Sequence, residues 1–176
     1  KPGWTDITAH LGVRFVPNFK GPGLKVRDFL PDGPADREAS RIKPNEIITH
    51  IDGKKIGPDI NLTPMLTGRL DRDIVLKVQS GARRKKQVRE IALRPFSYAS
   101  ARSRLYEKWI RDNRAAVDKF SANKLGYMHI RGMNMSSFFR FEEELYSVGA
   151  GKNGIIIDVR ENGGGSTTDH LLTILT

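Results

Sequence analysis

Short runs of apolar and polar residues, broken by turn sequences, occupy the first half of the chain. Their length and alternation predict five β-strands, at residues 12–16, 24–29, 45–51, 74–78 and 88–93. Asp52-Gly53 follows the third strand and is a strong hairpin turn signal. Pro34 and Pro64 suit the first turns of short helices that end near Ala39 and Leu70. We therefore expect this half to be rich in β-structure.

A helical period replaces this pattern from about residue 96 onward. Apolar residues recur every three or four positions as far as about residue 120, which predicts a long helix. A strand is predicted at 125–130, and Ser136 or Ser137 is predicted to cap the next helix. A strand at 154–158 and a last helix complete the series. Two strands joined through a helix predict a right-handed crossover and a parallel sheet.

The last strand and the residues after it are the most informative stretch of the chain. Residues 155–157 are three isoleucines in succession, which is typical of a strand buried on both faces. The run Gly163-Gly164-Gly165 lets the backbone turn tightly and lets another group approach it. Ser166, with Asp169 three residues on, predicts the start of a helix. Backbone amides in such a turn can stabilise a developing anion.

Composition narrows the class of protein. The 176 residues are 38% apolar and 28% charged, as in a globular protein of one or two domains. No apolar run approaches the ~20 residues that a membrane span needs, so no span is predicted. The sequence has no cysteine, which excludes disulfides, thiolate metal sites and a cysteine nucleophile. This fits a reducing compartment, and we expect a cytoplasmic protein.

The net charge of +10 raises the question of an acidic partner. Nucleic acid, an anionic membrane surface and acidic peptides would all be attracted. The one dense basic block, residues 83–86, lies between two predicted strands and reads as a solvated hairpin tip. No zinc-finger spacing or aromatic RNA-binding signature accompanies it. The scattered His, Asp and Glu show no metal-ligand spacing, so we predict no metal and no cofactor.

Four segments of the first half resemble a PDZ domain. They are His10-Leu-Gly-Val13, Leu30-Pro-Asp-Gly-Pro-Ala35, Ile42-Lys-Pro-Asn-Glu-Ile-Ile48 and Ile51-Asp-Gly-Lys54. One departure is Pro44-Asn45-Glu46, where bacterial PDZ domains commonly read Pro-Gly-Asp. The resemblance implies a PDZ domain at 10–95, after a lead-in at 1–9.

The resemblance also implies a peptide-binding site. Amides of Leu11, Gly12 and Val13 would hold a peptide's terminal carboxylate, and the peptide would add as a strand beside the second helix. His10 could assist the carboxylate or be structural. The alternative is that Gly12 simply begins a strand and that the groove is filled or unused.

Three segments of the second half occur in an order that resembles the tricorn protease family. They are Arg104-Leu-Tyr-Glu-Lys-Trp-Ile-Arg-Asp-Asn-Arg114, Gly126-Tyr-Met-His-Ile130 and Asp158-Val-Arg-Glu-Asn-Gly-Gly-Gly165. The last string is shared with the C-terminal processing peptidases. The resemblance implies a mixed α+β chain in which residues 96–176 are the first part of an α/β peptidase core of the crotonase- and ClpP-like kind.

The resemblance assigns a role to the glycine run. In the family one oxyanion contact comes from a backbone amide there, which implies Gly165, with Gly164 as the next choice. Asp158, Arg160 and Asn162 are expected to shape the turn rather than perform chemistry.

The catalytic serine and histidine of the family lie outside the matched segment, so we expect an excised piece that is inactive alone. The adjacent pair Ser166 and His170 is the alternative, against which Ser166 serves only as a helix cap.

These observations favour part of a serine-type peptidase that hydrolyses oligopeptides or protein C-termini. The PDZ domain would bind peptide or pack on the core, and the parent protein would be a homo-oligomer. The first alternative is a non-catalytic PDZ scaffold that binds peptides, and the third reading is a basic nucleic-acid-binding protein.

Overall fold

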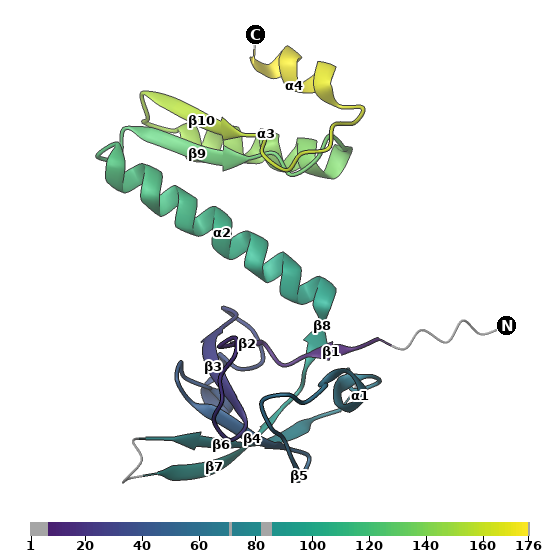
Figure 1. Ribbon diagram of the computed structural model, residues 1–176. Coiled ribbons are helices and arrows are strands. Elements are labelled where there is room, and N and C mark those ends of the chain that lie inside the picture. The colour runs from purple at the N-terminus through teal and green to yellow at the C-terminus, as the bar shows by residue number, and fades with distance from the viewer. Residues whose placement is uncertain (1–6, 71, 82–85, 176) are drawn as a thin grey trace, which may run out of the picture. The chain divides into compact units, whose positions relative to one another are not determined.

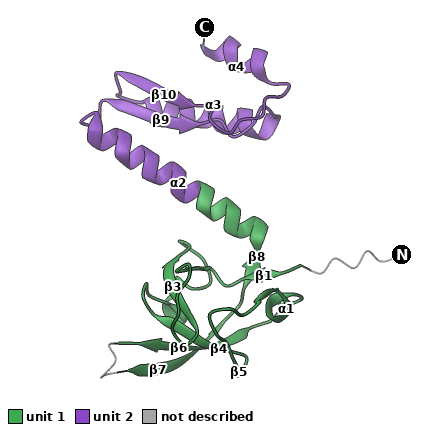
Figure 2. Cartoon of the chain, in the orientation of Figure 1, with its two compact units in different colours: residues 1–106 green, residues 107–176 purple. Residues whose placement is uncertain are grey.

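A computed structural model describes residues 7–70, 72–81 and 86–175. The chain divides into two compact units, residues 1–106 and 107–176, which are coloured separately in Figure 2. This division falls inside a helix, and the predicted domain boundary at Pro95 stays a prediction. Most of the basic block at 83–86 lies outside the described residues.

The first unit is built on one antiparallel sheet (Figure 1). Its strands are β2 (Val13–Phe15), β3 (Leu24–Phe29), β4 (Ile47–Ile51), β6 (Ile74–Ser80) and β7 (Gln87–Leu93), in the order β2-β3-β4-β6-β7. A short strand β5 (Lys54–Lys55) pairs with β4. The five predicted strands are thus confirmed, with shifts of one or two residues at five of their ten ends. A small second sheet pairs β1 (Ala9–His10) with β8 (Phe96–Ser97).

Aliphatic side chains from the sheet form the core of the first unit. Alternation along β6 buries Ile74, Leu76 and Val78 completely, as expected of a strand with one face against the core. The same core holds Leu11 and Val13, together with residues of the other strands and of helix α1 (Thr63–Leu66). The sequence pattern therefore fixes which face of each strand is apolar.

Both predicted helices of the first unit are shorter than expected. Instead of a helix from Pro34 to Ala39, the chain forms turns and one 3-10 turn, η1 (Glu38–Ser40). Helix α1 (Thr63–Leu66) ends well before Leu70, because Thr67 is extended and Gly68 has a φ of +69°. A residue with left-handed backbone geometry ends the helix that precedes it.

The second unit contains two parallel strands and their connecting helix. Helix α2 (Tyr98–Phe120) precedes β9 (Leu125–His129), which is followed by α3 (Met135–Gly149), β10 (Gly154–Asp158) and α4 (Thr168–Leu175). Strands β9 and β10 pair in parallel, from Gly154 opposite Leu125 to Asp158 opposite His129. The predicted helices, strands and parallel pairing are confirmed.

Two details of the second unit differ from the prediction. Helix α3 is capped by Asn134, whose side chain accepts from the Ser137 amide, so neither Ser136 nor Ser137 is the cap. Strand β10 is not buried on both faces, since Ile156 is 42% exposed. Its neighbours Ile155 and Ile157 pack on α3, whereas Ile156 faces an apolar groove of about 690 Å³ beside α2. A run of consecutive apolar residues shows that both faces of a strand are suited to burial. It does not show that other elements cover both faces.

Among the helices in the described ranges, none is both long and apolar enough to cross a membrane. Helix α2 is the longest, at 23 residues, but it carries many charged side chains.

Candidate functional site

The parallel strands β9 and β10 end at the same edge of their sheet, at His129 and Asp158. The amide of Ile130 donates to the Asp158 carbonyl oxygen at 2.9 Å, which extends the pairing by one residue. Polar residues that follow parallel strands gather at this edge, where sites in such sheets usually lie. The glycine run begins five residues after Asp158.

A buried carboxylate anchors this edge. The Asp158 side chain is 7% exposed and accepts from the Tyr127 hydroxyl at 2.7 Å. The Arg160 guanidinium donates to it at 2.5 to 3.0 Å, and Asn113 donates to the Tyr127 hydroxyl at 3.0 Å. Hydrogen bonding to Arg160 holds the pKa of Asp158 well below its usual range. Asp158 is therefore a fixed anion and a poor proton acceptor.

Tyr127 remains a hydrogen-bond donor at this anchor. Burial, followed by the adjacent Asp158 carboxylate, raises the pKa of the Tyr127 phenol. The phenol therefore stays protonated at neutral pH, and its hydroxyl donates a hydrogen bond to the Asp158 carboxylate.

His129 is held in a structural role beside this anchor. Its side chain is buried, and its Nε2 lies 2.8 Å from the carbonyl oxygen of Arg160. Because a carbonyl only accepts, Nε2 carries the proton. The ring meets Trp109 edge-on at 4.9 Å, and the Arg160 guanidinium lies 5.5 Å from the centre of the same indole. His129 is therefore part of the core of this unit.

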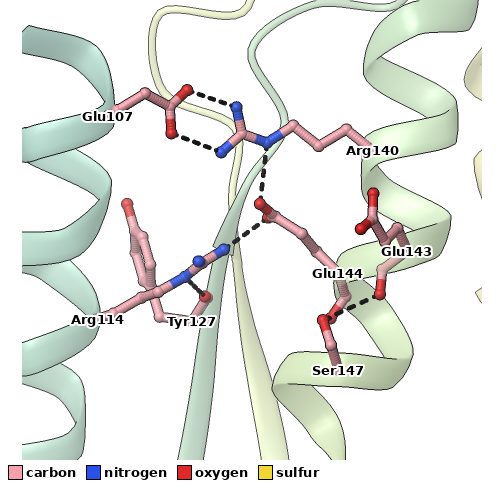
Figure 3. A network of polar contacts seen from close by, with 7 residues as sticks. All are labelled: Glu107, Arg114, Tyr127, Arg140, Glu143, Glu144 and Ser147. Atoms are coloured by element: carbon pink, nitrogen blue, oxygen red, sulfur yellow. Dashed lines mark hydrogen bonds and ion pairs between the residues drawn. The ribbon is translucent and has the colours of Figure 1, made fainter. Parts of the chain in front are cut away.

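An ion-pair network joins α2, α3 and β9 (Figure 3). Arg140 donates to both carboxylate oxygens of Glu107, at 2.7 and 3.0 Å, and to Glu144 at 2.9 Å. Glu144 also pairs with Arg114 at 2.8 Å, and Arg114 donates to the Tyr127 carbonyl oxygen at 3.1 Å. Hydrogen bonding to Arg140 lowers the pKa of Glu107. The network thus fixes the strand that carries Tyr127 between two helices.

Asn162 organises the turn that follows. Its side-chain NH₂ donates to the Ile130 carbonyl oxygen at 2.9 Å, and its side-chain oxygen accepts from the Gly164 amide at 2.9 Å. The preceding Glu161 has a φ of +62°, which reverses the chain direction. One carboxamide therefore ties the glycine run to the end of β9, as expected of a residue that shapes the turn.

The glycine run is held against Met133. Gly164 and Gly165 have φ values of +81° and +151°, and a Cβ on Gly165 would collide with the Met133 carbonyl oxygen. That oxygen accepts from the Ser166 amide at 3.0 Å. The Gly164 amide is already bonded to Asn162. For the Gly165 amide no partner is found in the described part of the chain, which leaves it available to a ligand.

Ser166 is not the cap of α4. The first bond of this helix runs from the Leu171 amide to the Thr167 carbonyl oxygen, which makes Thr167 the capping position. The backbone of Ser166 is instead held by Met133. The His170 ring lies against Phe138, with ring centres 5.7 Å apart.

The predicted peptide-binding loop lies in the first unit. Gly12 has a φ of +80°, and a Cβ there would come within 2.8 Å of Pro34. The Leu30 amide donates to the Gly12 carbonyl oxygen at 2.8 Å, so Val13 opposite Phe29 is a non-hydrogen-bonded pair. The Val13 amide therefore points to the outer edge of β2, the end strand of its sheet. The Gly12 amide, in contrast, donates to Nδ1 of His10 at 2.9 Å.

Within the described ranges no three His, Asp or Glu side chains come together closely enough to hold a metal ion. The sequence prediction missed Tyr127, Trp109 and Met133, which contact or support the site. Only the family strings around residues 104–114 and 126–130 pointed to the first two, and no signal pointed to Met133.

Comparisons with known proteins find similarity to peptidases. Residues 124–175 match the family model described as Peptidase family S41. A tricorn protease homologue of Streptomyces coelicolor is 27% identical over 157 residues, which cover 86% of this chain and 13% of that protein. The tricorn protease of Thermoplasma volcanium is 27% identical over 127 residues, which cover 72% of this chain and 12% of that protein.

A solved structure shares the fold. A crystal structure of the tricorn protease superposes with a TM-score of 0.66 at 23% identity, covering 95% of this chain and 16% of that one. The chain therefore spans only about an eighth of the length of the relatives it matches.

Proposed function

We propose that this chain, which is related to the tricorn proteases, forms part of a serine-type peptidase acting on oligopeptides or protein C-termini. The observation that carries the proposal is the Gly165 amide, which is left without a partner among the described residues in a turn fixed by Asn162 and Met133. A preorganised backbone N–H of this kind can donate to the oxyanion that forms when a peptide bond is attacked, and one such donor typically stabilises the transition state by about 3 kcal/mol.

The chain supplies the donor and its support. Asn162 occupies the Gly164 amide and sets the turn, so Gly165 rather than Gly164 faces the substrate in this proposal. Asp158 and Arg160 hold the end of β10 as an ion pair and take no part in proton transfer. The nucleophile and the general base are assigned to other parts of the protein, so residues 1–176 alone do not cleave peptides.

The first unit is proposed to be a PDZ-like module that binds a peptide C-terminus. Val13 supports this, because its amide faces the free edge of β2, where a peptide can add as a further strand. Leu11 and Gly12 complete the proposed carboxylate loop. We further propose that the protein is cytoplasmic, since the absence of cysteine suits a reducing compartment. We also propose that it forms a homo-oligomer and needs no cofactor.

Peptide hydrolysis by the protein in which this segment occurs tests the proposal. Asn162→Ala frees Gly164 and loosens the turn, and we expect kcat to fall about tenfold to a hundredfold with a smaller change in KM. Ser166→Ala is the matched control in the same turn and should leave kcat within about twofold.

Two results would contradict the proposal. Cleavage by the 176-residue chain alone, lost in Ser166→Ala, would make Ser166 the nucleophile. Binding of C-terminal peptides by a whole protein that has no peptidase activity would favour the scaffold alternative.

A further inference from the structure

One of the three proposed carboxylate donors is already occupied by the chain itself. The Gly12 amide donates to Nδ1 of His10, two residues earlier, at 2.9 Å. Gly12 is buried and has a positive φ. A peptide carboxylate that uses the Gly12 amide must therefore first displace the imidazole.

The bond requires a neutral imidazole. Nδ1 accepts only when it carries no proton, so the proton of the neutral ring is on Nε2. A doubly protonated ring has no acceptor and releases the Gly12 amide. Burial lowers the pKa of His10, so the ring is neutral and the bond intact at neutral pH.

The surroundings of His10 contain little that would hold a positive charge. The ring packs on Phe96 and edge-on against Tyr98, with ring centres 5.7 and 5.0 Å away. The Arg104 guanidinium lies 5.7 Å from the centre of the Phe96 ring. In the described part of the chain, no carboxylate forms an ion pair with His10. A bound peptide carboxylate would therefore be the first anion to reach the imidazole.

We propose that His10 is a proton-controlled gate on the carboxylate loop. The neutral ring occupies the Gly12 amide by accepting its hydrogen bond. Protonation of the ring breaks this bond, frees the amide and places a positive charge beside the incoming carboxylate. Ligands with a free C-terminal carboxylate then bind with uptake of a proton, and their affinity rises as the pH falls through the His10 titration. The release of Gly12 follows from the geometry alone, whereas the gain in peptide affinity rests on the proposed peptide binding.

The release of Gly12 is tested without any ligand. In the 176-residue chain, NMR would follow the Gly12 amide and the His10 ring between pH 4.5 and 7.5. We expect the Gly12 amide shift to follow the His10 midpoint, and its hydrogen-exchange protection to fall as the ring protonates. His10→Asn keeps an acceptor at the same place without a titrating group and should remove the pH dependence but keep the protection. A Gly12 amide that ignores the His10 titration would overturn the proposal.

The gain in affinity is tested with labelled peptides. The probes are fluorescein-labelled heptapeptides ending in Leu, Val, Ala or Phe, each with a free carboxyl terminus and as its amide. For free-carboxyl peptides we expect binding about fivefold tighter at pH 5.5 than at 7.5, which corresponds to a one-unit rise in the His10 pKa on binding. His10→Asn should abolish that ratio, whereas His50→Asn, in β4, should keep it.

The outcomes separate the two ideas. Binding that is equal at both pH values in the unmodified chain would overturn the gate. Absence of binding by all the peptides, with the Gly12 release still observed, would instead contradict the proposed peptide site and leave the proton-controlled release standing.

Discussion

The two units use the same local arrangement at their candidate sites, with different chemistry. In each, the amide of a glycine with positive φ donates to the side chain two residues earlier, Gly12 to His10 and Gly164 to Asn162, both at 2.9 Å. The imidazole can lose its acceptor by protonation, whereas the carboxamide cannot. Protonation can therefore break the hydrogen bond in the Gly12 turn, whereas the hydrogen bond in the Gly164 turn does not depend on protonation of its acceptor.

A hydrogen bond that does not change with protonation suits the Gly164 turn of the second unit. Because Asn162 occupies the Gly164 amide, the donor that we propose for a substrate is the Gly165 amide. In the first unit the glycine that is occupied is itself one of the proposed binding donors. The same hydrogen bond therefore supports one site and competes with a ligand at the other.

The largest expected effect comes from adding a methyl group to each glycine turn. Gly165→Ala meets the Met133 backbone in a conformation that only glycine adopts, and we expect a loss of about 4 kcal/mol in the free energy of unfolding. Gly12→Ala also has a positive φ and meets the Pro34 ring, but its shortest contact is 2.8 Å rather than the 2.3 Å of Gly165→Ala, so about 2 kcal/mol is expected. Urea denaturation, with hydrogen exchange to locate the change in each unit, measures both.

Gly163→Ala is the control for these substitutions, because no atom lies within 4 Å of the added Cβ and its φ is not positive. An equal loss for Gly163→Ala and Gly165→Ala would show that the glycines are needed only for chain flexibility.

A smaller effect is expected from acid. The folded-state pKa of Asp158 lies below its unfolded value, so its contribution is complete above about pH 5 and is lost as the pH falls below about 4. Asp158→Asn should cost about 2 kcal/mol at pH 7 and progressively less below pH 4. Asp112→Asn, at an exposed pair with Lys108, is the matched control and should change stability by less than about 0.5 kcal/mol. A cost for Asp158→Asn that did not shrink in acid would show that its charge is unimportant.

The smallest expected effect is a local one on hydrogen exchange, and it comes from giving the second turn the titrating acceptor of the first. Asn162→His places a titrating acceptor beside Gly164, and its amide exchange should become pH-dependent between pH 5 and 7.5. In the unmodified chain the exchange of Gly164, corrected for its intrinsic pH dependence, should stay constant over this range. A Gly164 amide that already varied with pH would remove the distinction between the two turns.

The sequence predicted helices and strands well where the spacing of apolar residues and the positions of turn residues indicate the same element. The three isoleucines of β10 and the run at 125–130 correctly indicated a parallel pair. The same isoleucines misled on burial, because the exposure of Ile156 depends on what covers the second face and not on the strand itself. Caps were misplaced at Ser136 and Ser137, since Asn134 lies nearer the start of the helix and accepts as well as serine does.

The fine structure of both sites could not be predicted for a different reason. Whether Gly164 or Gly165 keeps a free amide depends on one side-chain oxygen of Asn162, and pattern arguments do not place side chains. The bond from Gly12 to His10 likewise depends on a ring orientation set by Phe96 and Tyr98, which lie more than eighty residues away in the chain. The preference for Gly165 over Gly164 that family resemblance implies stays a prediction, and the Asn162 bond that supports it is visible only in three dimensions.

The double use of Asn162 restricts how this turn can vary among related sequences. Its carboxamide donates to one backbone group and accepts from another, at a length that places both within 2.9 Å. Aspartate keeps only the acceptor, serine is too short to span both groups, and glutamine is one methylene too long. A related protein that keeps the glycines but lacks asparagine at this position should therefore have a differently built turn, and this position serves as a marker for aligning distant members.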